Sequence, residues 1–135
     1  MRKDAREAVY KILFGNLFNE NDEEFRRLVY DEMKLSGSDR TFADNLFETV
    51  SAHREEIEGI IERNAKGYRF ERIYPTDKCA MELAIAEIFF IDDIPPVVSI
   101  DEALSLVRKF STEESLKFVN GVLAACKKEK EGAKT

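Results

Sequence analysis

The residue types that most often carry out chemistry in proteins are sparse in this sequence. His53 is the single histidine, so it has no second imidazole for a metal site, and we interpret it as a structural or surface residue. Cys79 and Cys126 show no CxxC spacing, so we interpret both as small core residues rather than zinc ligands or a disulfide. Acidic pairs such as Glu55-Glu56 and Glu113-Glu114 point in different directions on a helix, as on solvated faces. With no phosphate-cradling glycine loop, nucleophile elbow or dinucleotide fingerprint, the sequence gives no reason to expect an enzyme, a cofactor or a metal.

The binding of phosphate groups is a second kind of chemistry, and the N-terminal cations are its candidates. Arg2, Lys3 and Arg6 crowd the start of the first predicted helix, where the helix dipole disfavours each cation by a few tenths of a kcal/mol. They form either a phosphate-contacting patch or an ordinary solvated terminus, and in both cases removing all three should hardly change folding stability. The net charge of −6 argues against indiscriminate affinity for nucleic acid but leaves room for a local basic patch.

Apolar residues that recur at steps of three and four predict a series of helices that would position these side chains. Asp4, Asp22 and Thr76 are predicted N-caps, and Ser99-Glu102 and Ser111-Glu114 have the spacing of capping boxes. The predicted helices span residues 4 to about 18, 22 to about 35, 38 or 39 to 66, 77 to 90 as the central helix, 100 to 110, and 112 to beyond 126, with an extended link over 92 to 98. Periodicity alone does not decide whether residues 39 to 66 form one helix or two.

Length and composition set the class of fold. A chain of 135 residues with 44% apolar content fits a single domain with its own core. Six glycines and three prolines in a sequence rich in helix formers predict an all-α fold without a β-sheet. The sequence has neither an apolar run of about 18 residues nor a signal-peptide pattern, so we expect no membrane span and a cytoplasmic location.

Two local features leave alternatives open. Gly121 lies inside the last predicted helix, at a cost of roughly 1 kcal/mol relative to alanine, so we expect another helix to approach closely there and a leucine to overpack. Residues 68 to 74 are rich in aromatic side chains, which we expect to pack between subbundles, although Tyr68 could instead stack on a nucleic-acid base. After Cys126 the sequence mixes lysine, glutamate and glycine, which predicts a disordered tail over residues 129–135.

The amino-acid sequence of the C-terminal third resembles that of a known family. The residues Ile100-Asp101-Glu102-Ala103, then Lys109-Phe110, and then the run from Lys117 to Leu123 (KFVNGVL) resemble the C-terminal signature of the NusB family of bacterial transcription antitermination factors. The similarity extends back through Asp77-Lys78, Ala84 to Glu87 and Ile94-Pro95, and more weakly to Ala5-Arg6. The departures are Ser111 where the family usually has glycine, Glu82 where it usually has arginine, and Ala86 where it often has tyrosine.

The resemblance implies a fold and a set of partners. It implies one NusB-like domain over residues 1–128, with about six or seven helices in two packed subbundles and with residues 39–66 divided into two helices. Proteins of this family pair with NusE, a ribosomal small-subunit protein, and bind the single-stranded boxA element of nascent RNA in the transcription elongation complex. The resemblance also leaves open a homodimer of this chain.

The resemblance also implies site residues. Position by position, Arg2, Lys3 and Arg6 would contact RNA phosphates, and Phe110 and Lys117 would lie at the RNA surface near the last interhelical turn. Phe110 would either stack on a base or belong to the core. Asp77 and Glu114 match family positions close to the RNA and NusE surfaces.

Two other functions are compatible with the same fold. One is a protein–protein adaptor with little RNA affinity of its own, which the acidic balance and the small arginine cluster favour. The other is the NusB-like module of RNA methyltransferases, which would need a downstream catalytic domain.

Overall fold

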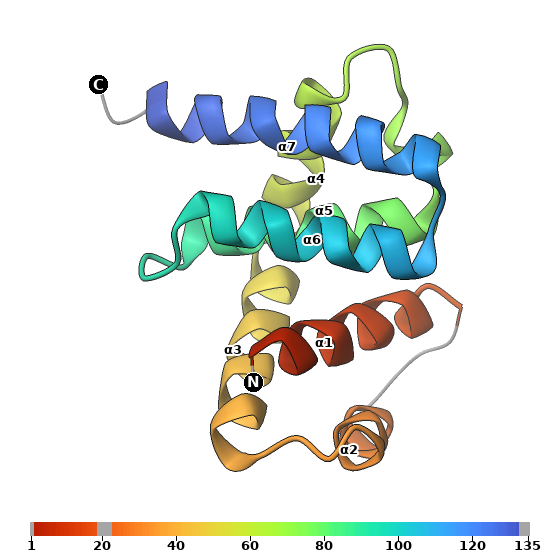
Figure 1. The fold of residues 1–135 in the computed structure, drawn as a ribbon, viewed down its shortest axis with the longest axis vertical. Helices are drawn as coiled ribbons and strands as arrows, with labels where there is room; N and C mark the ends of the chain where they lie inside the picture. Colours follow the sequence, from red (N-terminus) through yellow and green to blue (C-terminus); the bar gives the residue numbers. More distant parts are fainter. Residues whose placement is uncertain (1, 19–22, 133–135) are drawn as a thin grey trace.

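The computed structural model describes residues 2–18 and 23–132, and this part of the chain is α-helical without a strand (Figure 1). The helices are α1 (Arg2–Asn16), α2 (Glu23–Glu32), α3 (Gly37–Ala52), α4 (Arg54–Asn64), the 3-10 helix η1 (Phe70–Arg72), α5 (Pro75–Phe90), α6 (Pro96–Phe110) and α7 (Glu113–Gly132). The all-α class and the central helix over 77–90 are therefore confirmed.

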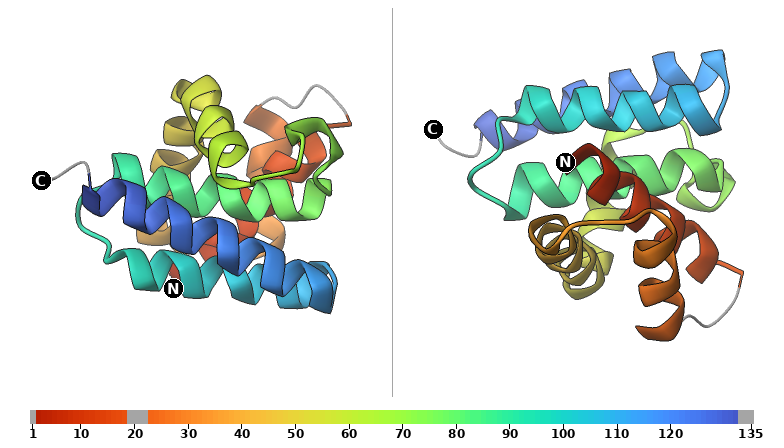
Figure 2. Two further views of the ribbon diagram at one scale, coloured as in Figure 1. Left: turned by 90° about the horizontal axis from the view of Figure 1, so that it is seen from above. Right: turned by 60° about the horizontal axis from the view of Figure 1, so that its bottom comes forward.

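Helix α5 is the centre of the domain. All of its residues from Cys79 to Ile88 are buried, and it packs against α1, α3, α4, α6 and α7. Helices α5, α6 and α7 lie side by side with α4 across them, whereas α1, α2 and α3 form the other part of the molecule (Figures 1 and 2). The arrangement in two packed subbundles is confirmed, and the apolar sequence of α5 is the physical reason that both subbundles share one core.

Helix α6 begins earlier than its predicted capping box. Pro96 occupies the first turn, where a missing N–H costs nothing, and the predicted extended link over 92–98 is therefore wrong for its last three residues. Ser99 is buried inside the helix, and its hydroxyl donates to Glu87 at 2.7 Å instead of capping. Thr76 is likewise not a cap, because α5 already begins at Pro75.

Two other caps are one or more residues away from their predicted positions. The Ser36 hydroxyl accepts from the N–H of Asp39 at 3.3 Å, so α3 begins at Gly37. The Thr112 hydroxyl accepts from the N–H of Ser115 at 3.1 Å, so Thr112, and not Ser111, caps α7.

In the N-terminal subbundle, one predicted cap and the predicted burial of two leucines are wrong. Asp4 lies within the first turn of α1, so it is not the cap, and Asp22 falls outside the described residues. Leu17 is 48% exposed just beyond the end of α1, and Leu28 is 61% exposed on α2, although the three-and-four spacing of the apolar residues predicts that both face inward. Helix α2 therefore buries a narrower face than its sequence suggests.

The segment 39–66 is divided into two helices, as the family resemblance implies. Helix α3 ends at Ala52, α4 begins at Arg54, and His53 stands between them. The imidazole of His53 stacks on the ring of Phe90 at 3.8 Å between centroids, which confirms a structural place for the single histidine. Gly67, with φ of +86°, provides the left-handed residue that follows the end of α4.

The C-terminal helix is longer than predicted. Helix α7 continues to Gly132, so residues 129–132 are helical where the sequence suggests a disordered tail, and residues 133–135 lie outside the described part. Cys79 and Cys126 are both buried free thiols, which confirms that they are core residues. Burial raises the pKa of both thiols. Across the described residues, no helix is long and apolar enough to cross a membrane.

Gly121 is exposed on α7, and a Cβ built at this position would meet nothing within 4 Å. The predicted close approach of another helix is therefore wrong. Because alanine has the higher helix propensity, Gly121→Ala is expected to raise the free energy of unfolding by about 0.5–1 kcal/mol, measured by urea denaturation. Gly67→Ala is the control, since its positive φ makes the same substitution destabilising. A Gly121→Ala protein that is less stable than the wild type would contradict the expectation.

Candidate nucleic-acid interface

Arg6, the residue expected to contact phosphate, belongs to the core. Its side chain is only 6% exposed and donates two hydrogen bonds to the carboxylate of Glu87, at 2.7 and 2.9 Å. Ser99 donates to the same carboxylate at 2.7 Å. This buried bidentate pair joins α1 to α5, so the basic cluster at the N-terminus is reduced to Arg2 and Lys3.

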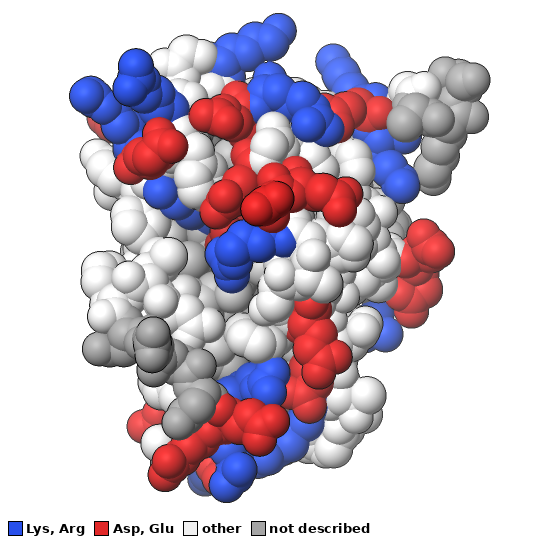
Figure 3. Space-filling view, turned by 180° about the vertical axis from the view of Figure 1, so that it is seen from behind, with Lys and Arg blue, Asp and Glu red and all other residues white. Residues whose placement is uncertain are grey.

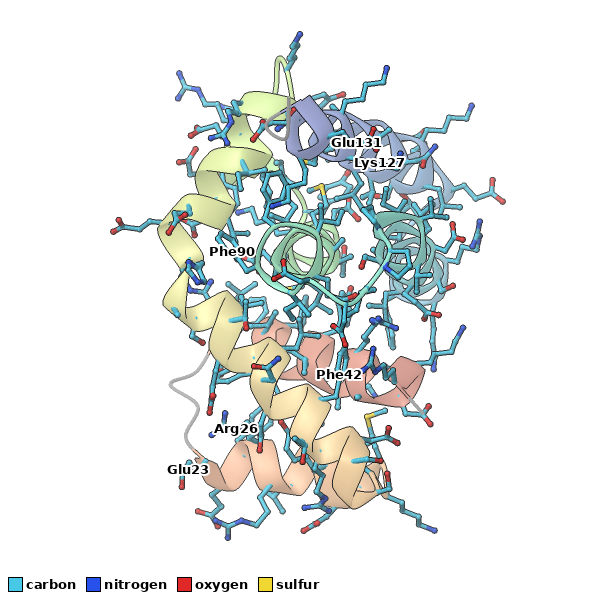
Figure 4. All side chains as sticks on the ribbon, turned by 90° about the vertical axis from the view of Figure 1, so that its left-hand side faces the viewer. Glu23, Arg26, Phe42, Phe90, Lys127 and Glu131 are labelled. Atoms are coloured by element: carbon cyan, nitrogen blue, oxygen red, sulfur yellow. The ribbon has the colours of Figure 1, made fainter. Side chains whose placement is uncertain are left out.

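Arg2 and Lys3 are exposed at the start of α1. The guanidinium of Arg2 lies 4.6 Å above the centre of the Phe42 ring, and that of Arg6 lies 5.3 Å from the same centre. Figure 4 shows Phe42 on α3 beside the start of α1. Arg2 is also 3.7 Å from a carboxylate oxygen of Asp93. The ring of Phe42 thus positions one exposed and one buried cation.

A crevice between α1 and α6 continues from these cations. It has a volume of about 200 Å³, and Lys3 lines it from α1 while Lys109 lines it from α6. Between them, Glu7 accepts from Lys109 at 2.7 Å and lies 3.4 Å from Lys11. Partial burial raises the pKa of Glu7, but the two lysines outweigh burial and hold the pKa below its usual value. The crevice therefore contains cations whose charge is partly neutralised by this carboxylate.

Phe110 lies at the end of α6, beside Lys109. Its half-buried ring stacks on Tyr10 with 5.2 Å between centroids and 25° between planes, and the Lys109 ammonium is 5.4 Å from its centre. Tyr10 is itself fixed by donating its hydroxyl proton to the carbonyl of Thr76, and burial raises the pKa of the phenol. One part of the Phe110 ring therefore packs in the core, as one of the two predictions for this residue states, and the other part lies at the surface.

Asp77 connects the start of α5 to the turn between α6 and α7. Its side chain is 2% exposed, and it accepts hydrogen bonds from Ser111 at 2.8 Å and from Ser115 at 2.7 Å. Ser111 thus supplies a hydroxyl that satisfies a buried carboxylate. Asp77 fixes the turn rather than offering a charge at the surface.

A groove of about 260 Å³ opens next to Asp77. Its other residues include Tyr68, Arg72, Tyr74, Glu114 and Phe118. Tyr68 and Phe118 contact each other with 4.7 Å between ring centroids. Tyr68 and Tyr74 are 57% and 62% exposed, so the prediction that this aromatic segment packs between subbundles is wrong for these two residues.

Of the residues that line this groove, only Asp77 and Glu114 were among the predicted site residues. Arg72 and Phe118 come from η1 and α7, and only the tertiary structure brings them together. The aromatic run before Pro75 was the available signal in the sequence. Of the predicted residues, Glu114 is exposed in the groove, and Lys117 is exposed on α7.

The face opposite to that of Figure 1 has no dominant charge. Figure 3 shows Lys and Arg side chains interspersed with Asp and Glu over this face. A specific anion site on such a protein must therefore come from a local cluster and not from the net charge of −6.

Fold and site together define an all-helical binding domain that offers a crevice with exposed cations and an aromatic groove to other molecules. The chain belongs to the NusB family, whose sequence model matches residues 3–128. It is 36% identical over 126 residues to the transcription antitermination protein NusB of Salinibacter ruber, an alignment that covers 92% of this chain and 79% of that protein. The NusB protein of Agathobacter rectalis is also 36% identical over 126 residues, with 91% of this chain and 96% of that protein covered.

Solved structures agree with the sequence comparison. A crystal structure of the antitermination factors NusB and NusE in complex with dsRNA matches with a TM-score of 0.86 and 32% identity, over 95% of this chain and 96% of the matched chain. The solution structure of NusB from Aquifex aeolicus matches with a TM-score of 0.81 and 32% identity, over 99% and 92% of the two chains.

Proposed function

We propose that this protein is a transcription antitermination factor that binds boxA-type RNA in nascent transcripts and pairs with NusE, acting in the cytoplasm. The observation that carries the proposal is the match along 95% of the chain to a NusB that was solved together with NusE and dsRNA. The protein's own surface adds two features that suit these two partners, one for each.

The proposed RNA surface follows the crevice between α1 and α6. Arg2 and Lys3 provide exposed cations for phosphates at one end. Phe110 provides an aromatic edge beside Lys109 at the other end, and Lys117 extends the basic character onto α7. Cations beside a partly exposed aromatic ring suit single-stranded RNA, which presents both phosphates and unstacked bases.

The proposed NusE surface is the aromatic groove. Tyr68 and Tyr74 expose large aromatic side chains beside Arg72 and Glu114, and the partly buried ring of Phe118 also lines the groove. Tyrosine and arginine are enriched at the energetically important centres of protein interfaces, whereas the carboxylates of Asp77 and Glu114 make this groove a poor phosphate site.

The test is a titration of boxA-type RNA at several salt concentrations, with and without NusE. In Arg2→Ala/Lys3→Ala, two lost phosphate contacts should reduce the slope of log affinity against log salt by about 1.4, since each contact contributes about 0.7 for a single strand. Arg6 stays unchanged because it belongs to the core. Lys66→Ala/Lys128→Ala is the matched control, as it removes two exposed cations near the ends of α4 and α7.

The adaptor alternative makes a different prediction in the same experiment. It is favoured by the burial of Arg6, which leaves only two N-terminal cations at the surface. An adaptor would bind NusE normally and would show no RNA affinity beyond that of NusE alone. Equal slopes for the double variant and the control would also contradict the proposed RNA surface.

A further inference from the structure

A second cluster of arginines lies in the other subbundle, away from the crevice between α1 and α6. Helices α2 and α3 enclose a groove of about 260 Å³, lined by Glu23, Arg26, Arg27, Tyr30, Arg40 and Asp44. Figure 4 shows Glu23 and Arg26 on α2, at the end of the molecule opposite to α7. Three guanidinium groups at one groove are unexpected in a chain with a net charge of −6.

Two of the three guanidinium groups are held on aromatic rings. Arg26 lies 4.7 Å above the centre of the Phe47 ring, and Arg40 lies 5.7 Å from the centre of the Tyr30 ring. Arg40 is further fixed by donating from Nε to the carbonyl of Leu35 at 3.2 Å. Cations that are already positioned lose less conformational entropy when they bind a ligand.

In formal charge the groove is close to balanced once Asp31 is counted, so its capacity for an anion rests on the guanidinium groups of Arg26 and Arg27, which form no ion pair among the described residues. Its lining contains three arginines and two carboxylates, and one carboxylate oxygen of Asp44 accepts the hydroxyl proton of Tyr30 at 2.8 Å. Arg40 also pairs with Asp31 outside the lining, whereas Arg27 is an exposed cation at the groove. A planar guanidinium matches the oxygens of a phosphate with two parallel hydrogen bonds, which makes phosphate the chemistry that this groove suits.

Helix α3 connects this groove to the start of α1. The guanidinium of Arg2 lies over the ring of Phe42 on one side of α3, and the guanidinium of Arg26 lies over the ring of Phe47 on another side. The five-residue separation between Phe42 and Phe47 corresponds to about 7.5 Å along the axis of α3 and to roughly 140° around it. A single helix therefore separates the two sets of cations, so one extended polyanion could contact both.

We propose that the groove between α2 and α3 is a second phosphate-binding site, which takes backbone phosphates of an RNA strand already held at the crevice between α1 and α6. The inference rests on the proposed RNA binding and adds a site in the other subbundle. Because phosphate contacts carry no base information, this site strengthens binding of long RNA without changing sequence preference.

The test compares a short RNA that contains only the boxA-type core with a longer unstructured RNA that contains the same core. In Arg26→Gln/Arg27→Gln, affinity for the short RNA should equal that of the wild type. For the longer RNA, the salt slope should fall by about 1.4, because two phosphate contacts are lost. Lys66→Gln/Lys128→Gln removes the same charge elsewhere and should bind both RNAs with wild-type slopes. Arg27→Gln alone, at an exposed position, keeps the test valid if loss of the Arg26–Phe47 contact lowers stability; its expected slope change is about 0.7.

Other results of this comparison separate a failure of the second site from a failure of the proposed RNA binding. A wild type that binds the short RNA but gains no salt slope with the longer one overturns the second site and leaves the proposed function intact. A wild type that binds neither RNA overturns both. If the salt slope for the longer RNA falls equally in the arginine variant and in the lysine control, the effect comes from net charge alone and the proposed site is wrong. If inorganic phosphate raises the melting temperature of the wild type but not of the arginine variant, while the RNA slopes are equal, the groove takes small phosphates and the RNA assignment is wrong.

Discussion

Replacing Arg6 with methionine is expected to lower the free energy of unfolding by about 3–5 kcal/mol, although arginine at this position looks like a surface residue in the sequence. The carboxylate of Glu87 is fully buried. After the substitution, Ser99 is the one hydrogen-bond donor to this carboxylate that remains among the described residues. An ionised carboxylate without a cation in a protein interior is costly, so the loss comes from the charge left behind. Urea denaturation monitored by circular dichroism measures the change.

The control for Arg6→Met removes the whole buried network. In Arg6→Met/Glu87→Leu/Ser99→Ala, no charge or hydroxyl of the triad remains, and most of the lost stability should return, since apolar side chains of similar size often replace buried ion pairs without cost. A single variant as stable as the wild type would contradict this account. The burial of Arg6 in this pair argues against the expectation that all three N-terminal cations can be removed without effect on folding.

Raising the pH from about 5 to about 8 is expected to destabilise the wild type by an amount that Glu82→Gln does not show. Burial raises the pKa of the Glu82 carboxyl to about 7, with a further increase from Glu58, against the opposing effects of Arg54 and Lys78. Arg54 is 3.4 Å from the carboxylate, so the ion pair only partly offsets the loss of hydration.

The sign of this pH effect follows from which state keeps the proton. Between about pH 4.5 and pH 7, the folded protein holds a proton on Glu82 that the unfolded chain has released. The contribution of the protonated Glu82 carboxyl to the free energy of unfolding is therefore present at low pH and is lost as the pH rises through 7. The shift of pKa corresponds to a loss on the order of 3 kcal/mol.

Chemical denaturation at several pH values checks this expectation. Glu82→Gln should be more stable than the wild type at pH 8, with the difference shrinking toward pH 5. The matched control is Glu62→Gln, an exposed position on α4 that should keep the wild-type pH dependence. Glu7 and Glu129, whose pKa values are lowered, affect stability only at more acidic pH. Parallel pH profiles for the wild type and Glu82→Gln would refute the assignment.

The sequence by itself determined the helices and their buried faces. Val9 on α1, Leu46 on α3, Ile85 on α5 and Leu123 on α7 are all fully buried, as their spacing predicts. This part of the fold is predictable because helical periodicity is a local property, and because apolar residues on one face must be removed from water whatever covers them. The run KFVNGVL is likewise a local feature, and it indicates the family without reference to the fold.

Only the tertiary structure decided what the polar side chains do. Arg6 and Glu87 are 81 positions apart, so nothing local distinguishes a buried ion pair from an exposed terminal cation. Ser99 has the sequence signature of a cap but bonds to Glu87, and Asp77 resembles a surface charge but accepts from two serines across an interhelical turn. A buried polar group must find a partner, and that partner is chosen by the packing of helices that are distant in sequence. For the same reason, the crevice between α1 and α6 and the arginine groove between α2 and α3 exist only once the helices have packed.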